Sequence, residues 1–96
     1  MNDVQQDYEK LGFTADQIEE IESGRQADVD ISIYAKPEFL AIQMREIRLG
    51  LISKVEAQRY ADSVYDWFQM QEIREGMEER LDIEKYACLL YTSDAA

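Results

Sequence analysis

The chain has 96 residues, of which 46% are hydrophobic and 32% charged, so it can form one small domain and is too apolar for a disordered acidic tail. Its net charge of −11 disfavours a general nucleic-acid binder, because the phosphates would repel it. The sequence has no His, which is the commonest general base and the commonest metal ligand, so no metal or other cofactor is expected. Its single Cys cannot form an internal disulfide.

The N-terminal segment, residues 1–12, is predicted to form a capping helix. Val4, Tyr8 and Leu11 have the spacing of one helical face. Only Tyr8 falls on a position that recurs later in the chain, so the segment is interpreted as a cap and not as a further repeat.

From residue 13 onward the sequence repeats at intervals of 26 residues, which divides it into residues 13–38, 39–64 and a truncated third copy, 65–87. Without any gap, six positions are identical in all three copies. The identical positions are Gln17, Gln43 and Gln69; Glu20, Glu46 and Glu72; Ile21, Ile47 and Ile73; Gly24, Gly50 and Gly76; Tyr34, Tyr60 and Tyr86; and Ala35, Ala61 and Ala87. Self-similarity at a fixed period predicts a repeat architecture.

Each copy is predicted to contain one longer helix. In the second copy Leu40, Met44, Ile47 and Leu51 form a single apolar stripe at helical spacing. The third copy repeats this stripe with Met70, Ile73 and Met77.

The start of the longer helix is predicted from capping boxes. Thr14 with Gln17, and Asp66 with Gln69, have the required spacing, whereas Leu40 breaks the box in the second copy.

The end of the longer helix is predicted at the repeated glycine, which would adopt a left-handed conformation just after the last turn. A short helix would follow from Ile31 to Ala35, with Asp30 as its N-cap and Pro37 as its stop. The third copy has the same pattern over 82–87.

A single copy cannot bury its own apolar face, but stacked copies bury a shared core. The predicted fold is therefore all-α: a short α-solenoid of three two-helix repeats with an N-terminal capping helix.

The segment Phe39–Leu51, preceded by Tyr34-Ala35, resembles a tandem repeat found in proteins of gut Firmicutes and their mobile elements. That repeat has an aromatic residue, three variable residues, Gln-Met, Glu-Ile-Arg, Gly-Leu and Tyr-Ala. The resemblance covers residues 13–87, although the first copy has Glu22 where the pattern has Arg. It implies a helical accessory repeat of bacterial or phage origin and no particular chemistry.

Residues 88–96 depart from the repeat. They resemble, residue for residue, the translation of a transposase adapter used to prepare sequencing libraries. We therefore interpret them as a non-native tail and expect the natural protein to be longer, with further repeats.

A candidate partner-binding face lies on the second and third copies. Ile42 and Leu49 fall opposite the Met44–Ile47 stripe, and one repeat later the position of Ile42 holds Phe68. With neighbouring residues, the predicted site consists of Ile42, Arg45, Leu49, Trp67 and Phe68. Apolar side chains on an outer face can mark a binding site, although packing between repeats would use the same residues.

The leading functional hypothesis is a non-enzymatic helical repeat module that binds another protein. Two alternatives remain: an acidic mimic of DNA that occupies a DNA-binding protein, and a fragment of the helical accessory domain of an enzyme. Residues 39–64 carry more bases than acids, which interrupts the acidic face that mimicry needs. No apolar run approaches the ~20 residues of a membrane span, and no signal peptide is expected, so the predicted location is the cytoplasm without a membrane partner.

Overall fold

The computed structural model describes the backbone of residues 8–95 and the side chains of residues 8–82. Most of the predicted capping helix, residues 1–7, lies outside the described residues, as do the side chains of Tyr86 and Ala87. Residues 8–10 are helical and are followed by a turn.

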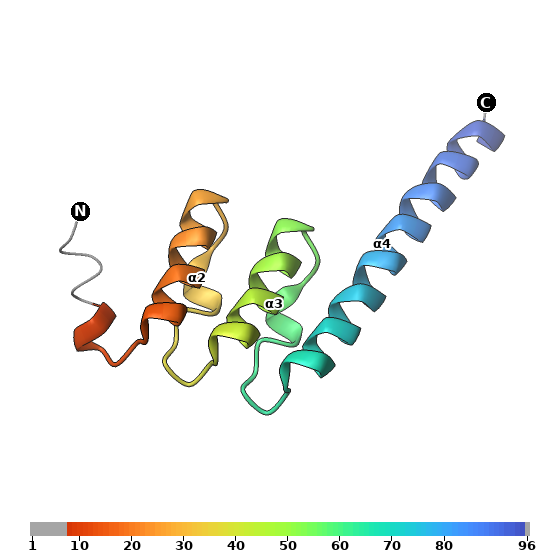
Figure 1. Cartoon of the computed structure of the whole chain (residues 1–96). Coiled ribbons are helices and arrows are strands. Elements are labelled where there is room, and N and C mark those ends of the chain that lie inside the picture. Colours follow the sequence, from red (N-terminus) through yellow and green to blue (C-terminus); the bar gives the residue numbers. More distant parts are fainter. Residues whose placement is uncertain (1–7, 96) are drawn as a thin grey trace.

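Five helical elements follow one another, and residues 8–95 contain no strand, which confirms the all-α class. They are α2 (Ala15–Gln26), the 3-10 turn η1 (Ile31–Ile33), α3 (Ala41–Ile52), the 3-10 turn η2 (Ala57–Arg59) and α4 (Trp67–Ala95). The bounds of α3 and η2 are those of α2 and η1 shifted by 26 residues. Figure 1 shows α2, α3 and the start of α4 side by side in one row and running in the same direction.

Capping boxes begin α2 and α4, as the sequence predicts. The N–H of Thr14 donates to Gln17 Oε1 at 2.7 Å, and the N–H of Gln17 donates to Thr14 Oγ1 at 3.2 Å. Asp66 and Gln69 form the same pair of bonds at 2.9 and 2.8 Å. Leu40 has no side-chain acceptor, but its N–H still donates to Gln43 Oε1 at 2.7 Å, so half of the box persists in the second copy.

The prediction that the repeated glycines terminate the helices is wrong. Gly24 and Gly50 lie inside α2 and α3, and the left-handed residues are Asp28 and Lys54, with φ of 60° and 66°. These two residues follow the helix ends by two positions, where their N–H groups donate to the carbonyls of Arg25 and Leu51 at 3.1 and 3.2 Å.

The glycines are required instead by a close approach of two tyrosines. A Cβ atom on Gly24 would overlap the hydroxyl of Tyr34, and one on Gly50 would overlap the hydroxyl of Tyr60. The hydroxyl of Tyr34 donates to the carbonyl of Glu20 at 2.7 Å, and that of Tyr60 to the carbonyl of Glu46 at 2.6 Å. Glycine therefore lets the phenol reach the backbone of its own unit's helix.

The core runs along the row of helices between the long helices and the 3-10 turns. Its fully buried large side chains are Tyr34, Tyr60, Phe39, Ile21, Met44, Ile47 and Met70. The predicted stripe of α3 is thus correct for Met44 and Ile47, but Leu40 is 65% exposed. Leu40 is the N-cap residue, outside the helical register that the stripe assumes.

Neighbouring helices are joined by two polar contacts that recur after 26 residues. Gln17 Nε2 donates to the carbonyl of Phe39 at 2.5 Å, and Gln43 Nε2 to the carbonyl of Tyr65 at 2.6 Å. The second contact is an ion pair, which joins Glu20 to Arg48 and Glu46 to Arg74, each at 3.1 Å. Each long helix therefore holds the next by an amide and a carboxylate.

The third copy departs from its prediction, because α4 does not break. It continues through the positions predicted for a turn and a second short helix, 82–87, and ends at Ala95. Where α3 reaches its end at Ile52-Ser53-Lys54, the third copy has Glu78-Glu79-Arg80, which are strong helix formers. Arg74 also pairs with Glu78 at 3.0 Å in the turn that leads to this point.

The buried phenols predict a loss of stability at high pH. Removal from water raises the pKa of Tyr34 from 10.0 to about 12, and burial raises the pKa of Tyr60 further. Between pH 10 and 12 the unfolded chain thus binds fewer protons than the folded chain, so stability is complete below pH 10 and falls as the pH rises towards 12. The urea midpoint of the original chain should fall as the pH rises across this range, and that of Tyr34→Phe should fall less steeply. An equal dependence on pH in the two proteins would contradict the raised pKa of Tyr34 as the cause.

Candidate interaction surface

Exposed apolar side chains gather at the starts of α3 and α4. Ile42 is 39% exposed, Trp67 41% and Phe68 52%. Arg45 is also exposed, whereas Leu49 is half-buried, so four of the five predicted residues face solvent. These four residues, Ile42, Arg45, Trp67 and Phe68, are called the outer ridge below.

The aromatic pair of the outer ridge comes from the first turn of α4. Asp66 caps this helix, which places Trp67 and Phe68 at its first two positions. Their ring centroids lie 5.7 Å apart at an interplanar angle of 89°, an edge-to-face contact. The contact fixes two large, half-exposed rings against each other at one end of the row of helices.

Ile42 and Arg45 line a shallow groove between α2 and α3. The groove has a volume of about 280 Å³, and its opposite wall carries Asp16, Glu19 and Glu20. Glu20 is already paired with Arg48, but Asp16 and Glu19 are exposed, and these two carboxylates against one guanidinium favour a basic group as the occupant. Trp67 and Phe68 do not line this groove, so the structure divides the predicted site into an aromatic pair and a mixed groove.

Leu49 belongs to neither part. It lies late in α3, in the same turn as Arg48, and is half-buried. A helical wheel centred on the apolar stripe places Leu49 opposite the core. However, α3 packs against both α2 and α4, which cover part of its sides.

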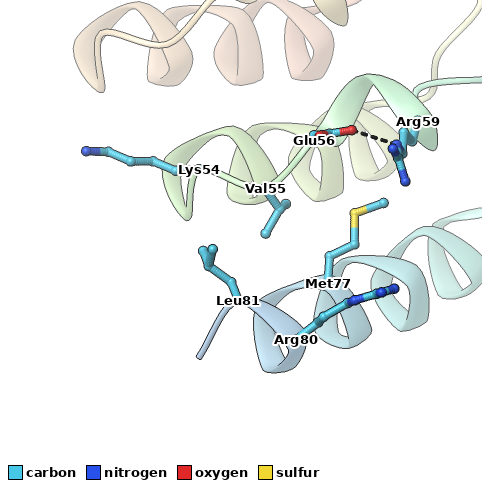
Figure 2. A pocket seen from close by; sticks show the side chains of 7 residues that line it. All are labelled: Lys54, Val55, Glu56, Arg59, Met77, Arg80 and Leu81. Atoms are coloured by element: carbon cyan, nitrogen blue, oxygen red, sulfur yellow. Dashed lines mark ion pairs between the residues drawn. The ribbon is translucent and has the colours of Figure 1, made fainter. Parts of the chain in front are cut away.

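A second groove was not predicted from the sequence. It has a volume of about 460 Å³ and lies between the η2 segment and α4 (Figure 2). Its lining residues are Lys54, Val55, Glu56, Arg59, Met77, Arg80 and Leu81. The groove exists because α4 continues past Met77 as a straight helix, so a sequence pattern that predicts a turn there cannot reveal it.

The charges of this second groove are partly compensated. Arg59 pairs with Glu56 at 2.6 Å, and both side chains are more than half exposed. Figure 2 shows Val55 directed towards Leu81, and Met77 rising from α4 towards Arg59. The floor is therefore apolar, and the rim is polar and well solvated.

Comparisons with known proteins leave the chain without an assigned family. No protein-family model, curated protein or solved structure matches it.

Two absences within the described residues concern metals and membranes. No group of three or more His, Cys, Asp or Glu side chains among them could hold a metal ion. Within the same part of the chain, no helix has the length and apolarity required to cross a membrane.

Proposed function

We propose that the chain is a short α-solenoid of 26-residue repeats that acts in the cytoplasm as a non-enzymatic module for binding another protein. The equal bounds of α2–η1 and α3–η2 support the repeat architecture, as do the tyrosine and glutamine bonds that recur in them. Repeat scaffolds present extended surfaces whose variable positions choose the partner. The resemblance of residues 13–87 to repeats of gut bacteria and their mobile elements supports an accessory role in such a host.

The observation that carries the proposal is the aromatic pair of the outer ridge. Trp67 and Phe68 remain 41% and 52% exposed, while the core is completed by other residues. Aromatic side chains are enriched among the residues that contribute most to protein interfaces, and burial of a half-exposed ring is favourable. Ile42 occupies the equivalent position one repeat earlier and is 39% exposed, so the neighbouring helix also presents an apolar side chain to solvent.

The outer ridge predicts a clear separation between stability and binding. Phe68→Ala and Ile42→Ala should each lower the free energy of unfolding by less than about 1 kcal/mol, because these side chains are already partly in water. Ile47→Ala, at a fully buried position of α3, should cost ~2–5 kcal/mol. Urea denaturation of the three variants measures the difference; if Phe68→Ala matches Ile47→Ala, the ridge is core and the proposal loses its support.

Binding is tested with a charge placed on the ridge. Phe68→Asp should abolish specific capture of a partner from a bacterial extract while leaving the circular dichroism spectrum unchanged. Leu11→Asp is the matched control, because Leu11 is 65% exposed at the other end of the chain. A partner retained by Phe68→Asp, or lost equally in both variants, would contradict the proposed surface.

A further inference from the structure

The face of α4 that is turned away from α3 carries a glutamine and a glutamate at the positions that α2 and α3 use to hold the next helix. Gln69, Glu72, Ile73 and Gly76 lie at i, i+3, i+4 and i+7 and therefore share one face of the helix. Arg74 lies about 200° around the helix from Glu72, since each residue turns the helix by about 100°, and it reaches back to α3.

In the first two units the glutamine and glutamate positions are occupied by contacts with the next unit. The glutamine amide donates to the carbonyl 22 residues later, and the glutamate carboxylate pairs with an arginine 28 residues later. As a result Gln17 is 6% exposed, Gln43 5% and Glu46 6%. The interface between the first and second units and that between the second and third units thus use the same two kinds of contact.

In α4 the corresponding positions are open. Gln69 and Glu72 are exposed, whereas Gln17, Gln43 and Glu46 are buried. Gln69 Oε1 accepts from the N–H of its own capping box, which directs the amide as in the other two copies. The face is therefore complete in its residues but not in the contacts that the described part of the chain makes.

We propose that this face of α4 binds one more repeat unit of the same type as residues 39–64. In that unit an arginine at the position of Arg48 and Arg74 pairs with Glu72, and a main-chain carbonyl at the position of Phe39 and Tyr65 accepts from Gln69. The proposal rests on continuity with two existing interfaces and on the acidic charge of Glu72. It does not depend on the outer ridge.

A second copy of this chain is a poor occupant for the same face. The first unit would present Glu22 at the arginine position, so two carboxylates would meet. That end is also covered, because Tyr8 packs edge-on against Phe13 with ring centroids 5.4 Å apart. Glu22 thus disfavours head-to-tail association of identical chains, and the occupant must be a unit that carries the arginine.

The test is the full chain with residues 39–90 duplicated in tandem, which places a unit with Arg48 after residue 90, in the same 26-residue register. Residues 79–87 then have to form the turn that follows α2 and α3. We expect the duplicated chain to unfold at a higher urea concentration than the original chain. Glu72→Gln should lower the midpoint of the duplicated chain and leave that of the original chain unchanged, whereas Glu75→Gln, an exposed glutamate on the same helix, should change neither.

A charge exchange distinguishes the proposed pair from a general effect of length. In the duplicated chain Glu72→Arg should lower the midpoint, and Arg→Glu at the second copy of Arg48 should restore it. The proposal is overturned if duplication does not raise the midpoint, or if Glu72→Gln acts equally in both chains. It is also overturned if sedimentation shows that the original chain dimerises through Glu72, which would make a second copy the occupant.

Discussion

Gly50→Ala should lower the free energy of unfolding by about 3 kcal/mol, because the new methyl group and the Tyr60 hydroxyl cannot occupy the same space. Tyr60 is completely buried, and its hydroxyl donates to the carbonyl of Glu46 at 2.6 Å. The phenol must therefore move away from α3, which disturbs the packing and breaks a buried hydrogen bond. Urea denaturation measures the loss.

The chain contains its own control for this substitution. Gly76 occupies the same repeat position in α4, but a Cβ atom there meets nothing within 4 Å in the part of the chain that the structure describes. Gly76→Ala should stabilise the helix by ~0.5–1 kcal/mol, so the same change has opposite signs at the two positions. Tyr60→Phe should recover part of the loss in Gly50→Ala, and its failure to do so would exclude the hydroxyl as the cause.

Arg74→Met should be the most damaging single change among the ion pairs. Arg74, in α4, contacts Glu46 of α3 at 3.1 Å and Glu78 of its own helix at 3.0 Å, and the Arg74 and Glu46 side chains are only 13% and 8% exposed. Methionine fills much of the volume but leaves the Glu46 carboxylate buried without a cation. We expect a loss at the lower end of the ~3–5 kcal/mol that follows when one partner of a buried pair is removed.

Arg59→Met is the matched control for that variant. Arg59 also pairs with a glutamate, Glu56, but the two side chains are 70% and 63% exposed, so the loss should be below about 1 kcal/mol. Both variants are measured by urea denaturation at low and at moderate salt. Equal losses would show that the pair between α3 and α4 contributes no more than a solvated one.

The 26-residue period could be predicted from the sequence because identical residues recur at that interval, whatever fold the chain adopts. The same is true of the helix starts, since a capping box is a local pattern that Thr14 with Gln17, and Asp66 with Gln69, satisfy without help from distant residues. Local signals of this kind survive in the structure.

Features that depend on contacts across the sequence could not be predicted in the same way. A repeated glycine is compatible both with a left-handed helix end and with a close approach, and only the position of Tyr34 over Gly24 decides between them. The unbroken α4 has a similar origin. The helix propensity of Glu78–Arg80 outweighs the pattern inherited from the earlier copies, and the groove beside Met77 follows from it.

The candidate surface was predictable where exposure follows from the helix register and unpredictable where neighbouring helices intervene. Ile42 and Phe68 face solvent as their spacing predicts, but Leu49 does not do so fully. A helical wheel treats α3 as an isolated cylinder, whereas α2 and α4 flank it on both sides.

The bonds that join one unit to the next have consequences for how the chain reaches its native state. They connect residues 22 or 28 positions apart, and the tyrosine bonds within a unit span only 14. Short separations keep the entropy of loop closure small, so folding on the microsecond-to-millisecond scale typical of low-contact-order helical proteins is expected. Structure can nucleate at the junction of α2 and α3 or at that of α3 and α4 and spread one unit at a time.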